Sequence, residues 1–128
     1  HLEHLDETWE RLRELLSDRG VLIVAVPNCS SYDAVKYGKY WAAYDVPRHL
    51  WHFTPVTIQQ FASKHGLIMA ARHPMPFDAF YVSMLSEKHR GSSFPFMKGM
   101  WVGTMAWLGT LTKKERSSSM IYVFRKKR

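Results

Sequence analysis

The sequence predicts an α/β fold of about three strands flanked by helices, with a helical insertion before the last strand. Three short apolar runs, at 21–26, 67–72 and 120–124, are bounded by turn residues as strands usually are. Segments with helical spacing of apolar residues lie between them. At 128 residues and 46% hydrophobic, the chain has enough apolar residues for one modest core. We therefore expect a single domain, or part of one.

The first predicted helix and the first predicted strand precede the stretch 40–53. Apolar residues recur on one face of 6–17, and Asp6 is placed to cap this helix. The run 21–26 has no alternation, which is typical of a strand buried on both faces of a parallel sheet. Ligands of open α/β sheets bind beyond the carboxyl ends of the strands, so Asn28 is a candidate substrate-binding residue.

The stretch 40–53 carries far more chemistry than a connector needs. Loops held by a rigid framework often carry function. We take as further candidate substrate-binding residues the polar and aromatic side chains of this stretch: Trp41, Tyr44, Asp45, Arg48, His49 and His52.

Each of these residues also has a purely structural interpretation. Asp45 and Arg48 either hold a polar ligand or pair with one another. The aromatic residues either line a pocket or cover the end of the sheet. His49 and His52 lack a nearby third ligand, so we predict no metal site.

The second half alternates strand and helix. Thr54 and Pro55 mark the start of a helix that His65-Gly66 ends, and the second strand follows at 67–72. Residues 77–117 form the insertion, which contains an uncharged run at 99–112. This run is shorter than the ~20 residues that span a bilayer. It is either a lid packed over the sheet or an interfacial helix that contacts a membrane through 94–114.

The charge and the cysteine content indicate which classes of binding partner and which cellular compartment to expect. The net charge is +7, but much of the excess lies in Lys113-Lys114 and at 125–128, which is typical of solvated basic segments. We therefore regard nucleic acid as an improbable partner. The single cysteine, Cys29, excludes an internal disulfide and has no evident activating group. No signal peptide is evident, and we expect a cytoplasmic protein.

Several of these residues, taken in order, carry a resemblance to a known family. The matching segments are Glu3-His4-Leu5, Pro27-Asn28 and above all Asp45-Val46-Pro47-Arg48-His49-Leu50 with His52-Phe53-Thr54. They resemble the second half of class I S-adenosylmethionine-dependent methyltransferases. Within that superfamily the chain is similar to the type 11/12/23 branch, near the ubiquinone-biosynthesis O-methyltransferases. The resemblance covers 2–72 and extends to the last strand.

The resemblance implies methyl transfer from S-adenosylmethionine to a small-molecule acceptor. It assigns His4 as the catalytic base and places Leu2 and Glu3 at the cofactor. In the ubiquinone-type relatives the matching Glu-His pair can also bind a divalent metal, and a histidine that only starts a helix is a third interpretation. The segment 77–117 corresponds to the variable region that commonly shapes the acceptor pocket.

The family's glycine-rich cofactor loop has no counterpart among the seven glycines. The resemblance therefore implies a carboxyl-terminal half, with the amino-terminal cofactor-binding half absent and the isolated chain inactive. The strand at 21–26 would then have an open edge, from which we expect self-association. The alternative is a non-catalytic α/β module that binds an anionic membrane or nucleic acid through the basic tail and the aromatic loop.

Overall fold

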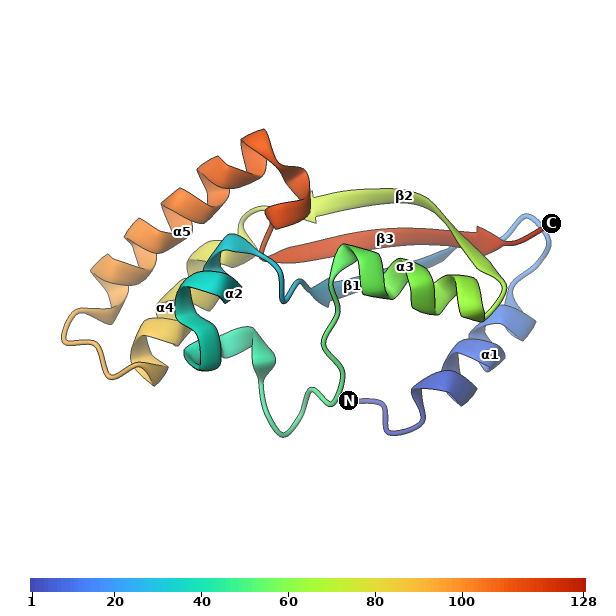
Figure 1. Ribbon diagram of the computed structural model, residues 1–128, viewed down its shortest axis with the longest axis horizontal. Helices are drawn as coiled ribbons and strands as arrows, with labels where there is room; N and C mark the ends of the chain where they lie inside the picture. Colours follow the sequence, from blue (N-terminus) through green and yellow to red (C-terminus); the bar gives the residue numbers. More distant parts are fainter.

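A computed structural model describes all residues, 1–128, as an α/β fold with a three-stranded sheet and five α-helices (Figure 1). Short 3-10 turns occupy 38–40, 42–44 and 114–116. The longer elements follow in the order α1 (Leu5–Leu15), β1 (Leu22–Pro27), α2 (Tyr32–Tyr37), α3 (Pro55–Lys64), β2 (Leu67–Met75), α4 (Asp78–His89), α5 (Pro95–Thr112) and β3 (Ser119–Lys126).

The sheet has the strand order β1-β3-β2, and β3 is antiparallel to both neighbours. The predicted parallel sheet is therefore wrong in its pairing, although β1 and β2 run in the same direction. The reason lies in the insertion: α4 and α5 form a hairpin that returns the chain to the end of β2, so Ser119 pairs with Met75 and β3 runs back. As expected, β1 is an edge strand.

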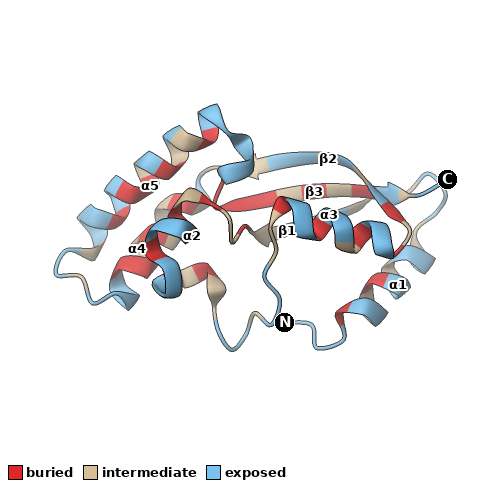
Figure 2. Cartoon of the chain, in the orientation of Figure 1, coloured by how far each residue is buried: buried red, intermediate tan, exposed pale blue.

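Both α1 and α3 pack on one face of the sheet. Leu22, Val24 and Val26 contact the cluster on this face, whereas Ile23 on the opposite face is 64% exposed. The prediction that β1 is buried on both faces is therefore wrong (Figure 2). The buried members of this sheet cluster are Leu5, Trp9, Ile58, Ala62, Leu67, Met120, Tyr122 and Phe124.

A second cluster lies where α2 and the following loop meet the α4–α5 hairpin. Two hydrogen bonds tie it together: the Tyr37 hydroxyl donates to Glu87 Oε1 at 3.0 Å in a buried contact, and the Ala42 N–H donates to Ser86 Oγ at 2.8 Å in a partly buried one. Burial, reinforced by Glu87, raises the pKa of Tyr37 well above its ordinary value, so the hydroxyl remains a donor. The buried apolar members of this helical cluster are Ala34, Tyr37, Trp41, Ala43 and Val102.

The two predicted helix starts have different outcomes. α3 begins as expected: Thr54 Oγ1 accepts from the Thr57 N–H at 3.1 Å, and Pro55 occupies the first turn. α1 begins at Leu5, one residue before the predicted cap, so His4 precedes the helix and Asp6 lies inside it. Asp6 instead accepts hydrogen bonds from Lys64 at 2.7 Å and from His65 Nε2 at 2.8 Å, and thus joins α1 to the end of α3.

Different segments of the chain lie at the two ends of the sheet. The loop 40–53 and the α4–α5 hairpin adjoin the carboxyl end of β1, where Pro27 pairs with Ser119. The basic tail at 125–128 lies at the other end, where Leu22 pairs with Phe124, and its first two residues are the last two of β3. None of the helices has both the length and the apolar content that a bilayer crossing requires.

Candidate functional site

An apolar cavity of about 260 Å³ lies at the carboxyl end of β1. Its walls come from the start of the chain, from β1, from the loop 41–53 and from α3. Eleven of its fifteen lining residues are hydrophobic, and the polar ones are three histidines and a cysteine. The lining residues are His1, Leu2, Leu5, Trp9, Val24, Ala25, Val26, Pro27, Cys29, Trp41, His49, Trp51, His52, Phe53 and Ile58.

His49 presents a hydrogen-bond acceptor at this cavity. Its Nδ1 lies 3.0 Å from the carbonyl oxygen of Ala43. Because a carbonyl oxygen only accepts, Nδ1 carries the proton and Nε2 of the neutral ring has a free lone pair. The ring also stands edge-on to His1, with centroids 4.9 Å apart. A fixed tautomer with a free Nε2 is what a general base or a metal ligand needs.

His52 is held in the same way by a different atom. Its Nε2 donates to the carbonyl oxygen of Tyr44 at 3.0 Å, so Nδ1 is the free acceptor. The ring packs edge-on against Tyr44, with centroids 4.9 Å apart. Tyr44 also packs edge-on against Trp41 and does not line the cavity itself. The predicted residue Tyr44 therefore supports two wall residues.

Trp41 forms a buried wall of the cavity and is 1% exposed. Its Nε1 donates to Asp33 Oδ2 at 2.8 Å, and the Ser118 hydroxyl donates to the same oxygen at 2.7 Å. Asp33 is fully buried, and its Oδ1 has no hydrogen-bond partner. The sequence analysis missed Asp33 because its partner Ser118 is 85 residues away. The only local signal was Ser31, which caps α2.

Asp45 and Arg48 form an ion pair with one another, which is the second of their two predicted interpretations. Arg48 Nη2 and Nε donate to Asp45 Oδ1 at 2.7 and 3.1 Å. Asp45 has a left-handed backbone, with φ of 43°. Both residues face a second hollow of about 430 Å³ between the loop and α4, which His49 also lines.

Asn28 is fully buried, and its side chain uses its whole hydrogen-bonding capacity within the protein. Nδ2 donates to the carbonyl oxygens of Glu115 and Ser117, at 2.7 and 3.0 Å. Oδ1 accepts from the N–H and the hydroxyl of Ser30, at 3.1 and 2.7 Å. No atom of the amide is left for a ligand. Asn28 therefore fastens the end of β1 to the segment that leads into β3.

The residues that the resemblance placed at the cofactor and the base lie near the start of α1. Leu2 lines the cavity, and its carbonyl oxygen accepts from Trp51 Nε1 at 2.7 Å. Glu3 and His4 are exposed and lie outside the cavity lining. Their assigned roles stay predictions of the resemblance.

His1, Asp45 and His49 form the one cluster of potential metal ligands, with ligand atoms within 4.8 Å of one another. His49 Nε2 and Asp45 Oδ2 are 4.0 Å apart, wider than the roughly 3.3 Å between two ligands of a tetrahedral zinc ion. Arg48 adds a positive charge on the same carboxylate. An ion here would need the three side chains to close in and would meet repulsion from Arg48.

Cys29 lines the cavity as a thiol. Burial raises the pKa of the Cys29 thiol above its ordinary value, and the S–H group donates to the carbonyl oxygen of Phe53 at 3.2 Å. Neither effect favours the thiolate, so Cys29 has the character of a structural cysteine.

The chain has been compared with known protein families and with curated proteins. No family model matches the sequence, and no curated protein is similar to it.

Proposed function

We propose that this chain is the acceptor-binding part of a methyltransferase that uses S-adenosylmethionine. The observation that carries the proposal is the cavity at the carboxyl end of β1, which residues of the stretch 40–53 help to line. This stretch holds the motif on which the resemblance rests. Ligands of open α/β sheets bind beyond the carboxyl ends of the strands. The position of the cavity thus supports the same proposal as the sequence motifs.

The cavity favours a small acceptor with an apolar, flat body. Its walls include the rings of Trp9, Trp41 and Phe53, and its hydrogen-bond acceptors are the free ring nitrogens of His49 and His52. A ligand with one hydroxyl group would bury its body against the rings and donate its proton to a histidine. We infer that the acceptor atom is a hydroxyl oxygen.

In this proposal His49 acts as the general base. Methyl transfer to a hydroxyl oxygen is helped when a positioned base takes the proton. His49 lines the cavity, and the contact of its Nδ1 with Ala43 leaves Nε2 as the acceptor of the neutral ring, whereas His4 is exposed and lies outside the lining. Ala43 holds the ring, and the buried Trp41 forms one wall of the cavity.

The residues present do not by themselves form a site for S-adenosylmethionine. No aspartate, glutamate or glycine lines the cavity, so no carboxylate is available there for ribose hydroxyls and no open backbone for the methionine part. In this proposal those contacts come from sequence outside residues 1–128. When bound, the cofactor supplies the methyl group, and this chain binds and orients the acceptor.

The alternative is a non-catalytic module that binds an anionic partner through the aromatic loop and the basic tail. The positions of these two segments do not support it. The aromatic loop follows the carboxyl end of β1, while the basic tail lies at the end of β3 that pairs with the start of β1. The two lie at opposite ends of the sheet and do not form one surface.

The test is calorimetric titration of S-adenosylmethionine into residues 1–128 and into a longer product of the same gene. We expect binding by the longer protein only. In that protein, His49→Ala should lower kcat at least roughly a hundredfold, as loss of a general base does. Cofactor affinity should stay unchanged.

His89→Ala is the matched control, because His89 is an exposed histidine at the end of α4 outside the cavity. It should leave kcat unchanged. Absence of cofactor binding by both proteins would overturn the proposal. Full activity of the His49→Ala variant would overturn the assignment of the base.

A further inference from the structure

α5 buries its small residues and exposes its large ones, the reverse of a helix in an ordinary soluble fold. The buried residues are Gly99, Val102, Gly103, Ala106 and Thr110, which recur at helical spacing along one side. Figure 2 shows these buried positions alternating with exposed turns along the whole helix.

The close approach of α4 explains why the inner side must be small. A Cβ atom added at Gly99 would lie 2.5 Å from Met84 Cα, and one added at Gly103 would lie 2.8 Å from Phe80 Cα. Real Cβ atoms do not come this close to a backbone. The large apolar residues of α5 therefore cannot turn toward α4 and must point outward.

The outer side forms a continuous apolar surface, which we call the α5 face: Phe96, Met97, Trp101, Leu108 and Leu111. Four of these side chains are between 64% and 71% exposed, and Leu108 is 44% exposed. Their spacing places them on one side of an 18-residue helix. Single exposed apolar residues are common, but a contiguous patch of this kind marks a binding surface.

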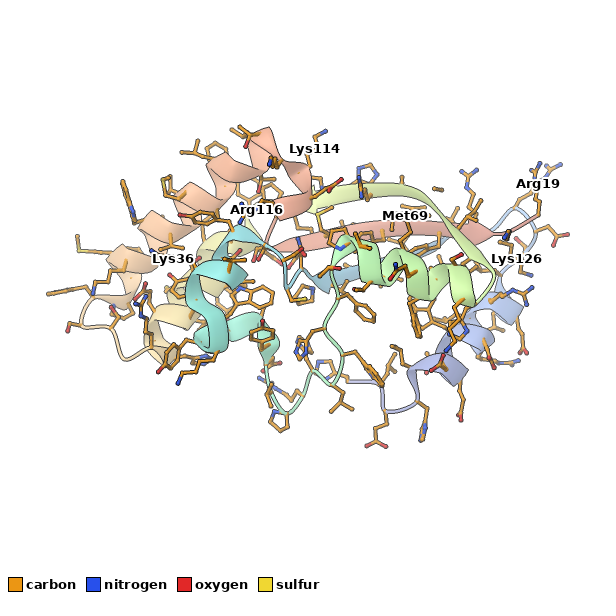
Figure 3. All side chains as sticks on the ribbon, viewed as in Figure 1. Arg19, Lys36, Met69, Lys114, Arg116 and Lys126 are labelled. Atoms are coloured by element: carbon orange, nitrogen blue, oxygen red, sulfur yellow. The ribbon has the colours of Figure 1, made fainter.

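The polar groups around the α5 face are mostly cationic. Lys98 lies on the helix, and Lys114 lies just beyond its end (Figure 3). Lys88 and Arg90 lie at the end of α4, before the turn that leads into α5. The nearby acidic side chains already have partners: Glu87 is buried against Tyr37, and Glu115 pairs with Arg72.

We propose that the α5 face docks on the surface of an anionic phospholipid bilayer. At a rise of about 1.5 Å per residue the helix is roughly 27 Å long, and it would lie in the plane of the interface. Trp101 and the aliphatic residues enter the acyl boundary, and the lysines at both ends meet the lipid phosphates.

The charge of the surroundings favours a bilayer over a second copy of the chain. In a symmetric dimer the same patch meets itself, which would bring two copies of these lysines together. An anionic membrane instead supplies the opposite charge. The proposal rests on α5 alone and does not depend on the proposed function.

The experiment is sedimentation of the 128-residue chain with vesicles. One set contains phosphatidylcholine alone, and in the other a third of the lipid is phosphatidylglycerol. We expect roughly tenfold stronger partitioning onto the anionic vesicles at low salt, and a fall toward the neutral-vesicle value at high salt.

The variant that tests the face is Trp101→Gln combined with Leu111→Gln. Both side chains are about two-thirds exposed, so the fold should survive, while partitioning should fall roughly tenfold or more. The matched control is Val35→Gln combined with Val56→Gln, which changes equally exposed apolar residues on α2 and α3. It should bind vesicles as the unchanged chain does.

Two results would overturn the proposal. One is absence of binding to either kind of vesicle. The other is a dimer in ultracentrifugation that the Trp101→Gln, Leu111→Gln variant dissociates while lipid binding stays unchanged, because the face would then be covered by a second copy.

Discussion

The sheet cluster and the helical cluster are built in different ways. The sheet cluster contains large apolar side chains such as Trp9, Ile58 and Phe124, packed between one face of the sheet and two helices. The helical cluster contains small residues around two rings, Tyr37 and Trp41. It is joined by hydrogen bonds in which Tyr37 donates to Glu87, while Asp33 and Ser86 accept.

The two clusters differ in how firmly the positions of their side chains are fixed. An apolar core of roughly the right volume tolerates replacement by another apolar side chain of similar size. A buried hydrogen-bonded network has fixed directions and is costly when half of it is removed. The cavity wall at Trp41 belongs to the second kind of packing, so the geometry of the candidate site depends on polar contacts behind it.

The largest expected effect is at Asp33. Asp33→Ala would leave Trp41 Nε1 and the Ser118 hydroxyl buried without an acceptor, and should lower the free energy of unfolding by about 3 kcal/mol. In the sheet cluster, Met120→Leu keeps the volume of a buried apolar side chain and should cost less than about 1.5 kcal/mol. Urea unfolding followed by fluorescence measures both. Equal losses in the two variants would remove the distinction between the clusters.

A smaller effect is expected from the packing of α4 against α5. Gly99→Ala places a methyl group against the Met84 backbone and should cost about 1–3 kcal/mol. Gly109→Ala on the same helix meets no atom within 4 Å, and should stabilise the protein by about 0.5–1 kcal/mol through helix propensity. Thermal unfolding of both variants tests this. A stabilising Gly99→Ala would mean that the hairpin is loosely packed.

The smallest effect concerns pH and the sheet cluster. Lys64, and after it His65, hydrogen-bond Asp6 and hold the pKa of its carboxyl below the ordinary value of 3.8, although desolvation opposes them. A lowered pKa in the folded state means that Asp6 stabilises the fold above about pH 4 and loses this effect as the pH falls through the folded pKa.

The difference between the urea midpoints of the unchanged chain and of Asp6→Asn should therefore be present above about pH 4 and shrink as the pH falls below it. Asp18→Asn, at an exposed position, serves as the control. A constant difference down to pH 3 would show that charge on Asp6 is irrelevant to folding.

Local signals predicted the elements well, and long-range contacts limited the rest. Thr54 and Pro55 define the start of α3 within four residues, so the sequence was enough. The partner of β1 is β3, nearly a hundred residues later, and no local pattern indicates that β3 enters between β1 and β2. The unbroken run 21–26 suggested burial on both faces, but Ile23 is exposed.

The candidate site was predicted in place but not in detail. The stretch 40–53 does line a cavity, through Trp41, His49 and His52. The sequence predicts that Asn28 and Tyr44 contact a ligand, whereas in the structure both support neighbouring groups. Residue type and spacing identify a polar side chain, whereas its hydrogen-bond partners depend on segments that only the fold brings together.

The central position of β3 has a consequence for how the chain acquires its fold. β1 and β2 leave the ribosome before β3, and neither pairs with the other, so within residues 1–128 no strand ladder exists until β3 has been made. Closing contacts over such sequence separations is slow. Until then the nascent chain exposes two unpaired strands, and the interval between their synthesis and that of β3 is when a chaperone would be needed most.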